Sequence, residues 1–391
     1  MQDSPVTSIN QVPVKDWDRA PWNRWSFQHV REIIPTAEVW RGKGPVNPLP
    51  ESPVDFSSLT FKDYADQEQT LSNWLDMDFN DGLIVLHRNS IVHESYRNNM
   101  TNRSLHLSQS VAKSITSCVA GKLVEEGLLD LNASITTYLP ELESTAYRGA
   151  TLQQLLNMSS GVRYIEDYEA LDSHIAATDI ACGWKPPRQG VEAPNCIWQQ
   201  ILTLKESDAE HGERFNYRSI ETDVIAHAME RVSGKRLTEL VSQYLWRPLG
   251  CDESANFTVD RAGYPLACGG FNATLRDYAR VGLMLSHYGQ ANGQQIVPEK
   301  WVRDTTRSES NIVDEGRKKL LPNGGYKNQF WLRNVDTNVM MARGVFGQLI
   351  YADPDSDYVV VILSTWPEFT SINRSLTALN GIDAMLKFLT Q

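Results

Sequence analysis

Two parts of the chain contain the short apolar segments that are typical of strands. The segment from Gly82 reads GLIVLHRNSIVHESY, in which two runs rich in Ile and Val flank the turn-forming residues Arg88-Asn89-Ser90. Near the other end, residues 339–365 read VMMARGVFGQLIYADPDSDYVVVILST, and Asp353-Pro354-Asp355 separates two further apolar runs. Short β-branched runs on either side of turn residues indicate antiparallel hairpins. We therefore predict two strands in each part.

Apolar residues follow a helical spacing in much of the remaining chain. Residues 110–126 read SVAKSITSCVAGKLVEE and predict a helix that ends at Gly127. Similar patterns predict helices at residues 150–158, 221–234, 275–289 and about 374–389. Strands at both ends of a helical middle indicate a discontinuous α/β domain, residues 1–127 and 271–391, with an inserted, mainly helical domain at 128–270.

The first 60 residues show no sustained hydrophobic period. They are rich in Pro and Trp, which indicates an extended arm over the surface. We expect Trp22, Trp25 and Trp40 to hold this arm in place by packing against the rest of the molecule.

Charge and composition disfavour several classes of partner. The 391 residues carry a formal net charge of −11, whereas nucleic-acid binding needs clustered Lys and Arg. No apolar run approaches the roughly 18 residues that span a bilayer, and the first residues do not resemble a signal peptide. The five cysteines are odd in number and include no CxxC pair. We expect a cytoplasmic protein with reduced cysteines and no membrane or nucleic-acid partner.

Ser110 and Lys113 form the only Ser-x-x-Lys in the chain. Three residues are about one helical turn, so both side chains leave the same face of the predicted helix and the amine can reach the hydroxyl. A lysine can take the proton of a serine if burial and nearby positive charge disfavour its ammonium form. The ordinary alternative is a helix-capping serine beside a solvated lysine, because so short a motif often arises by chance.

Tyr217 is the candidate for the third group of a proton relay. It lies in a loop between two predicted helices, where a phenol can point into a cleft. A tyrosine paired with a lysine can carry the proton of the serine to the leaving group. Tyr96 ends a predicted strand and Tyr326 lies in a Gly-rich turn, so we expect structural roles for both.

Five motifs occur in the order and spacing of the serine β-lactamases and penicillin-binding proteins. They are Ser110-x-x-Lys113, ATLQQLLNMSSGV (150–162), Tyr217-x-Ser219, GGFNATLRDYARVG (269–282) and Gly344-Val345-Phe346-Gly347. The chain resembles the class C and esterase side of this superfamily. Within it, the chain is most similar to the 6-aminohexanoate-dimer hydrolases, which cleave nylon oligomers.

The resemblance implies a fold, a site and a set of roles. The fold would be an antiparallel sheet flanked by helices with an inserted helical domain, as in β-lactamases and DD-peptidases. The active site would lie in the groove between the domains, without a metal or cofactor. Ser110 would be the nucleophile, Lys113 its base and Tyr217 the proton relay. The backbone N–H groups of Ser110 and Val345 would form the oxyanion hole that stabilises the developing negative charge.

The resemblance also implies two substrate-binding residues. Tyr168 and Asp179 match positions that contact the substrate in the nylon-oligomer hydrolases. The tyrosine would act at the scissile amide, and the carboxylate would hold a cationic amino end. The ordinary alternatives are a half-buried packing residue for Tyr168 and a helix cap for Asp179.

Two positions depart from the family pattern. Phe346-Gly347 stands where β-lactamases carry Lys-Thr-Gly and where the nylon-oligomer hydrolases carry a His before the Gly. The missing cation argues against recognition of a β-lactam carboxylate and makes Phe346 a candidate pocket residue. Cys268 falls at a position that lines the substrate cleft in relatives, although it could also be a small buried apolar residue.

The first interpretation is a serine hydrolase that cleaves small amides or esters through an acyl-enzyme. Nylon-oligomer-like amides are its most specific substrate class, and a homodimer is a possible assembly. One alternative is a carboxylesterase of the same fold that hydrolyses amides poorly, and another is a catalytically silent ligand-binding protein. The absence of His-Glu-x-x-His and of Gly-x-Ser-x-Gly disfavours zinc proteases and Ser-His-Asp hydrolases.

Overall fold

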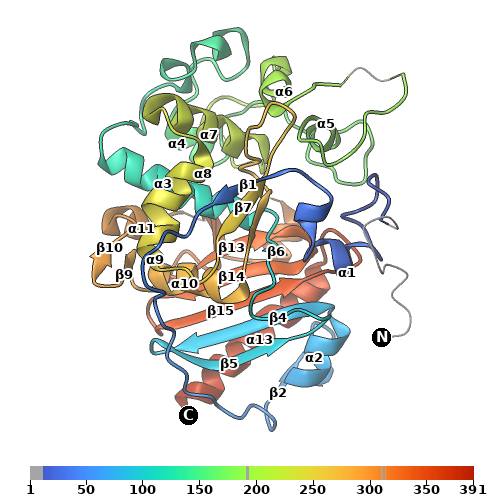
Figure 1. Ribbon diagram of the computed structural model, residues 1–391, viewed down its shortest axis with the longest axis vertical. Coiled ribbons are helices and arrows are strands. Elements are labelled where there is room, and N and C mark those ends of the chain that lie inside the picture. The colour runs from blue at the N-terminus through green and yellow to red at the C-terminus, as the bar shows by residue number, and fades with distance from the viewer. Residues whose placement is uncertain (1–11, 191–192, 310, 313) are drawn as a thin grey trace.

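An antiparallel sheet of seven strands, in the order β11-β12-β13-β14-β15-β4-β5, lies at the centre of the fold (Figure 1). The computed structural model describes residues 12–190, 193–309, 311–312 and 314–391. Strands from the two ends of the sequence meet inside the sheet, where Val360 pairs with Val85. The strands are β4 (Asn80–His87), β5 (Ser90–Tyr96), β11 (Gly325–Lys327), β12 (Phe330–Leu332), β13 (Met340–Gly344), β14 (Gln348–Asp353) and β15 (Tyr358–Ser364).

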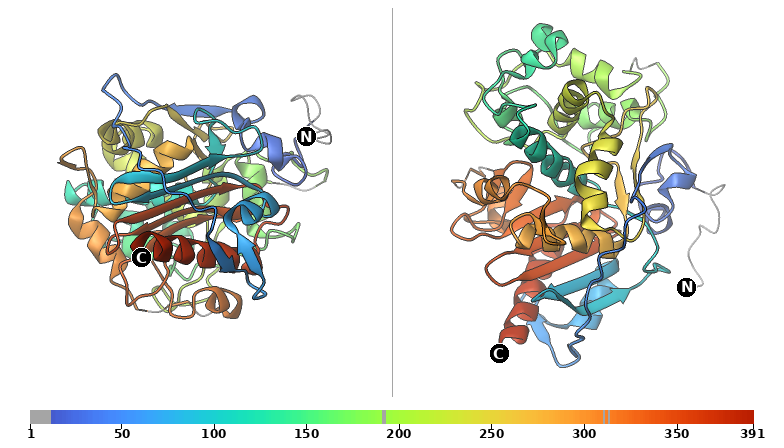
Figure 2. Two further views of the ribbon diagram at one scale, coloured as in Figure 1. Left: turned by 90° about the horizontal axis from the view of Figure 1, so that it is seen from below. Right: turned by 60° about the vertical axis from the view of Figure 1, so that its left-hand side comes forward.

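Both faces of this sheet are covered, because its central strands are apolar on both sides. Val361 of β15 belongs to a buried cluster that includes residues of helix α10 (Leu275–Ser286). Its neighbour Val360 points to the other face and belongs to a second cluster with residues of helix α13 (Ile372–Thr390). Seen along the sheet, α13 lies on one face and most of the molecule on the other (Figure 2).

Most of the regular secondary structure between β5 and α10, drawn in green and yellow in Figure 1, is helical. α3 (Val111–Glu125) packs against α7 (Ile220–Ser233) and also contacts strands β13 and β14, so it joins the helical part to the sheet. None of the described helices has both the length and the apolar character needed to cross a bilayer. The other helical elements here are η3 (Ile135–Thr137), η4 (Pro140–Ser144), α4 (Leu152–Leu156), α5 (His174–Ala181), α6 (Ile197–Thr203), α8 (Leu237–Val241), the π-helical turn η5 (Ser242–Trp246) and α9 (Arg247–Leu249).

Smaller sheets and short helices complete the fold. A four-stranded sheet contains, in spatial order, β1 (Thr36–Val39), β7 (Ala255–Thr258), β8 (Phe271–Ala273) and β6 (His106–Leu107). Two hairpins pair β2 (Thr60–Lys62) with β3 (Glu68–Thr70), and β9 (Gln290–Ala291) with β10 (Gln294–Gln295). The remaining helical elements are α1 (Asn23–Ser26), η2 (Val30–Glu32), α2 (Leu71–Met77), α11 (Glu299–Thr306), α12 (Glu315–Leu320) and η6 (Val345–Gly347).

The structure confirms the predicted mixture of helices and antiparallel sheet, including the hairpin β4–β5. The prediction of only two strands in residues 339–365 is wrong, because β13 precedes β14 there. The chain reverses between them at Phe346, which has a φ of +62°. Turns with a positive φ usually have Gly, Asn or Asp at that position, so the sequence did not indicate this turn. Trp22 and Trp25 pack against the core as predicted. Trp40 is 43% exposed, and its contacts are with the Arg247 guanidinium, 5.6 Å from its ring centroid, and with the Ser242 hydroxyl, which donates to its carbonyl. The division into two domains stays a prediction.

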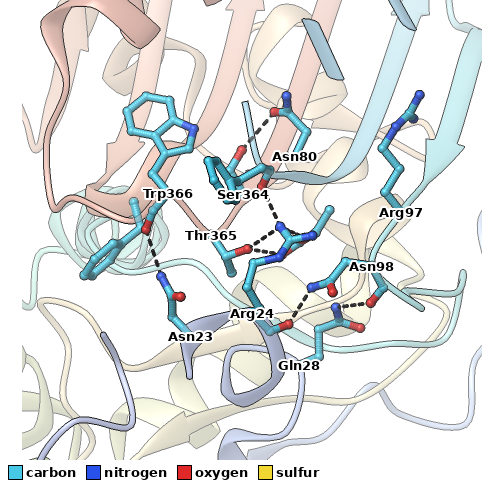
Figure 3. Close-up of polar contacts among 12 residues, drawn as sticks. Asn23, Arg24, Gln28, Asn80, Arg97, Asn98, Ser364, Thr365 and Trp366 are labelled. Carbon is cyan, nitrogen blue, oxygen red and sulfur yellow. Dashed lines mark hydrogen bonds and ion pairs between the residues drawn. The ribbon is translucent and has the colours of Figure 1, made fainter. Parts of the chain in front are cut away.

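The N-terminal segment is held to the sheet by polar contacts with the loop after β15 (Figure 3). The side-chain amide of Asn23 donates to the backbone carbonyl of Trp366 at 2.8 Å. The guanidinium of Arg24 donates to the Thr365 hydroxyl and to the carboxylate of Asp81, both at 2.8 Å. The Asp81 side chain is completely buried. This segment therefore fixes the start of the loop that leaves the sheet at residue 365.

Arg24→Met is expected to lower the free energy of unfolding by about 3 kcal/mol, because the buried Asp81 carboxylate would lose the guanidinium that pairs with it. Urea denaturation followed by tryptophan fluorescence measures this change. Arg97→Met is the matched control, since Arg97 pairs with the largely exposed Asp76, and exposed pairs contribute about 1 kcal/mol or less. Equal losses in the two variants would contradict the importance of the buried pair.

Candidate active site

Ser110 and Lys113 are in contact at the start of α3. Ser110 is the N-cap residue of this helix, and Lys113 lies one turn further along. The Lys113 Nζ donates hydrogen bonds to Ser110 Oγ at 2.8 Å and to the backbone carbonyl of Cys268 at 2.6 Å. Lys113 is only 1% exposed, so the alternative of a solvated lysine does not apply.

A tight backbone contact places Ser110 beside the end of β13. Gln109 adopts a φ of +51°, which turns the chain sharply into the helix. Gly344 approaches this turn so closely that a Cβ atom there would lie 2.4 Å from the carbonyl oxygen of Ser108. Only glycine permits this approach. As a result, Val345, which follows Gly344, lines the same cavities as Ser110.

Tyr217 reaches the same place from the loop before α7. Its ring stacks on Trp331 with 5.4 Å between the centroids, and the Lys113 Nζ lies 5.2 Å from its centroid. The phenol interacts with both the Ser110 hydroxyl and the Lys113 amine, and these interactions favour its phenolate form. The structure therefore brings together the three side chains that the sequence pointed to.

The protonation states of Lys113 and Tyr217 depend on each other. Burial lowers the pKa of the Lys113 amine. The negative charges that Tyr217, Cys268 and Glu166 carry when ionised act the other way and raise that pKa above its usual value. Burial also raises the pKa values of Tyr217 and Cys268 themselves. When phenol and thiol are neutral, the amine loses the two anions that most favour its ammonium form, and burial favours the free base.

Two cavities meet at Ser110. The larger has a volume of about 320 Å³ and extends past Tyr217 toward α12 and α13. The smaller has a volume of about 40 Å³ and extends past Cys268 toward α5. Both cavities are lined by Ser110, Tyr168, Val345 and Phe369. A bound molecule that occupies both cavities would therefore pass directly over the Ser110 hydroxyl.

Tyr168 and Asp179, the predicted substrate-binding residues, both reach these cavities. The Tyr168 ring stacks on Phe369 at 4.9 Å, and its hydroxyl donates to Glu166 at 2.5 Å. Asp179 lines the smaller cavity from within α5 and does not cap that helix, which is capped by Ser173. Burial, and then the neighbouring Asp18, raise the pKa of Asp179 to about 7.

Cys268 and Phe346 line the smaller cavity as well. Burial raises the pKa of the Cys268 thiol well above its usual value, so the thiol is a neutral apolar group, and the backbone carbonyl is what contacts Lys113. Phe346 is 1% exposed and packs against Phe27 at 5.4 Å and Phe369 at 4.8 Å. Its ring therefore supports the cavity wall.

Two carboxylates, the half-buried Glu166 and the buried Asp223, support the site and were missed by the sequence analysis. Glu166 accepts hydrogen bonds from the backbone N–H and the hydroxyl of Ser219, each at 2.6 Å. Asp223 accepts from the backbone N–H of Cys268 at 3.3 Å and so helps to fix the peptide that contacts Lys113. The motif Tyr217-x-Ser219 was recognised, but nothing in it indicated that its serine would meet a glutamate 53 residues away.

Two arginines of the larger cavity were also missed. The sequence analysis looked for a cation at Phe346-Gly347 and found none there. Strand β13, which ends just before this motif, carries Arg343, and α12 carries Arg317; both arginines line the larger cavity. The absence of a cation at residue 346 therefore does not make this cavity neutral.

Comparisons with known proteins agree with this geometry. A family model described as Beta-lactamase matches residues 80–380. The 6-aminohexanoate-dimer hydrolase of Paenarthrobacter ureafaciens is 35% identical over 366 residues, which cover 93% of this chain and 91% of that protein.

Solved structures show the same fold, and the sequence matches define the family. A provisionally assigned 6-aminohexanoate-dimer hydrolase from Bacillus anthracis has a TM-score of 0.90 at 28% identity, covering 98% of this chain and 99% of that one. A family VIII carboxylesterase has a TM-score of 0.60 at 16% identity, over 81% of this chain and 94% of that one, and shows the fold alone. Since the family model covers most of the chain and a hydrolase is 35% identical along nearly all of it, this protein belongs to the beta-lactamase family and is a serine hydrolase.

Proposed function

We propose that this protein hydrolyses small linear amides through an acyl-enzyme on Ser110. The observation that carries the proposal is the 2.8 Å hydrogen bond between Lys113 Nζ and Ser110 Oγ, made by a buried amine at the junction of two cavities. The 35% identity to a 6-aminohexanoate-dimer hydrolase supports amides of that kind as the substrate class.

Acylation starts with the Ser110 hydroxyl. Lys113, as the free amine, takes the hydroxyl proton while Oγ forms a bond to the carbonyl carbon of the substrate. The carbonyl oxygen becomes an oxyanion and accepts hydrogen bonds from the backbone N–H groups of Ser110 and Val345. Ser110 is the N-cap of α3, and Val345 is the first residue of η6. Backbone N–H groups at the start of a helix have no partner within it, which supports this role.

The acyl-enzyme forms when the C–N bond breaks. Tyr217, which interacts with both Ser110 and Lys113, passes the proton to the departing nitrogen, so that a neutral amine leaves. Tyr168 lines both cavities beside Ser110 and is placed to contact that nitrogen. Water then attacks the ester carbon by the same route, which releases the acid and returns the proton to Ser110.

Asp179 is the proposed site for a cationic amino end on the acyl half of the substrate. It lines the smaller cavity, on the other side of Ser110 from α12 and α13. The nearby Asp18 is already paired with Lys185, whereas Asp179 forms no ion pair with any of the described residues. A carboxylate in this position can pair with a substrate ammonium.

Ester hydrolysis is the alternative activity of the same site. An alkoxide leaves more readily than an amine, so the same three side chains can act on esters with less help at the leaving atom. A catalytically silent ligand-binding protein would fail to react with a fluorophosphonate probe at Ser110, and this labelling separates it from both hydrolases.

We also place the protein in the cytoplasm. All five of its cysteines belong to the described residues and are buried and unpaired, which fits a reducing compartment. Self-association into a homodimer stays a prediction.

Ser110→Ala is expected to abolish turnover and to leave the thermal unfolding midpoint nearly unchanged, because it removes only the hydroxyl that attacks the substrate. Intact-mass spectrometry of the wild type with a slow ester should show one acyl adduct, mapped to Ser110. Retained activity in the variant, or an adduct on another serine, would contradict the mechanism.

Lys113→Ala and Tyr217→Phe should each lower kcat by roughly a hundredfold or more, since each removes one member of a shared proton relay. The double variant should lose much less than the product of the two losses. Tyr326→Phe is the matched control, because the Tyr326 ring lies 5.9 Å from that of Tyr217 and Tyr326 has no role in the proposed proton relay. Fully multiplicative losses would show that Lys113 and Tyr217 act independently.

Asp179→Asn should lower kcat/KM for an amino-terminated amide by roughly 10- to 100-fold, the contribution of a charge-assisted hydrogen bond. Neutral p-nitrophenyl esters should be unaffected. The pKa of about 7 also predicts that the wild-type ratio of amide to ester kcat/KM rises with pH through neutrality, as the carboxylate forms. A ratio that is flat with pH, or equal losses on both substrates, would argue against an ammonium site.

A further inference from the structure

Arg317 and Arg343 are two cations of the larger cavity without an acidic partner. Among the residues that the structure describes, neither guanidinium forms an ion pair with a carboxylate. Two acidic residues line the same cavity and are engaged otherwise. Asp78 pairs with Arg374 at 2.5 Å, and Asp314 accepts the backbone N–H of Arg317 to cap helix α12. The cavity therefore offers two guanidinium groups that no carboxylate of the described residues pairs with.

The two guanidinium groups lie around the same pair of aromatic rings. The Arg317 Cζ is 5.7 Å from the ring centroid of Tyr217 and 5.8 Å from that of Trp331. The Arg343 Cζ is 6.0 Å from the Trp331 centroid, on the strand that leads to Val345. Arg343 donates one hydrogen bond, to Ser375 Oγ at 3.1 Å, and a guanidinium has five N–H donors. Donors thus remain for a bound group.

The two guanidinium groups also repel each other. Burial, and then the positive charge of Arg317, lower the pKa of Arg343 to about 10, which still leaves it charged near neutral pH. Two cations with few partners in a partly desolvated site gain the most from an anion that both can contact. The planar donors of guanidinium match a carboxylate better than other anionic or neutral groups of a small amide.

The two cavities also differ in the charged groups that lack an ion-pair partner among the described residues. Asp179 is such a group in the smaller cavity, whereas the larger one has two cations of this kind, Arg317 and Arg343, besides the helix-capping Asp314. Ser110 lines both cavities. A linear molecule with an ammonium at one end and a carboxylate at the other matches this polarity. Its scissile carbonyl would lie over Ser110 when each end occupies the cavity of opposite charge.

We propose that Arg317 and Arg343 bind the carboxylate at the leaving-group end of a linear amide and so determine specificity at that end. This inference rests on the amide hydrolysis proposed above and assigns the residues that recognise the leaving group. Neither charged end changes during the reaction. The amine that leaves carries the carboxylate with it out of the larger cavity.

The first experiment compares 6-aminohexanoate dimer with the same dimer ending in a carboxamide. Arg317→Gln and Arg343→Gln should each lower kcat/KM for the carboxylate form by roughly 10- to 100-fold, mainly through KM. Hydrolysis of the carboxamide form should change less than about twofold. Arg333→Gln is the matched control, because Arg333 pairs with Asp383 and does not line the cavity. Equal losses on both substrates in Arg317→Gln would overturn the proposal.

The second experiment requires no turnover. Hexanoate and hexanamide are titrated calorimetrically into Ser110→Ala, with and without Arg317→Gln. Hexanoate should bind more tightly than hexanamide, and Arg317→Gln should weaken hexanoate alone by at least about tenfold. Hexanoate binding that is unchanged by the substitution would overturn the proposal, since the carboxylate would then lie elsewhere, such as at the backbone amides beside Ser110. If the wild type cleaves no amide, the proposed function fails, and this titration still tests the carboxylate site.

Discussion

A lysine amine inside a protein needs partners on every side, and much of this fold supplies them to Lys113. The Ser110 hydroxyl and the Cys268 carbonyl accept its hydrogen bonds. Asp223 in turn holds the Cys268 peptide, and the Tyr217 ring closes the remaining side. These groups come from α3, α7 and the segment before β8, so the contact exists only when helices and sheet are packed together. The balance between burial, which lowers the pKa of Lys113, and its partners, which raise it, is therefore a property of the whole fold.

The loop after β15 connects the N-terminal segment to the site. Trp366 of this loop lines the larger cavity, and Asn23 holds its backbone carbonyl. Phe369 lines both cavities, and the Arg19 guanidinium lies 3.8 Å above its ring. The arm therefore shapes the substrate-binding walls although it contributes no catalytic group.

The choice between amides and esters depends on the leaving-group side more than on the nucleophile. In the proposed mechanism, Ser110, Lys113 and Tyr217 form an acyl-enzyme from either class of substrate. The larger cavity adds Arg317 and Arg343, which can orient an amine product that carries a carboxylate. Orientation lowers the barrier most for the poorer leaving group, because correct placement of the nitrogen is required for its protonation. In this proposal, the arginines that bind the substrate carboxylate also position the amide nitrogen for cleavage.

The sequence by itself determined the parts that depend on neighbours in the chain. Ser110 and Lys113 are three residues apart on a helix, and the hairpin β4–β5 follows from apolar runs around a turn. Tertiary structure alone decided the contacts between distant segments, such as Glu166 with Ser219 and Arg317 with Arg343 around Trp331. It also decided the turn at Phe346, which separates β13 from β14 without a polar residue. Periodicity reports which residues share a face of one element, whereas the partner of a buried charge is set by how the elements pack, and no local pattern records that packing.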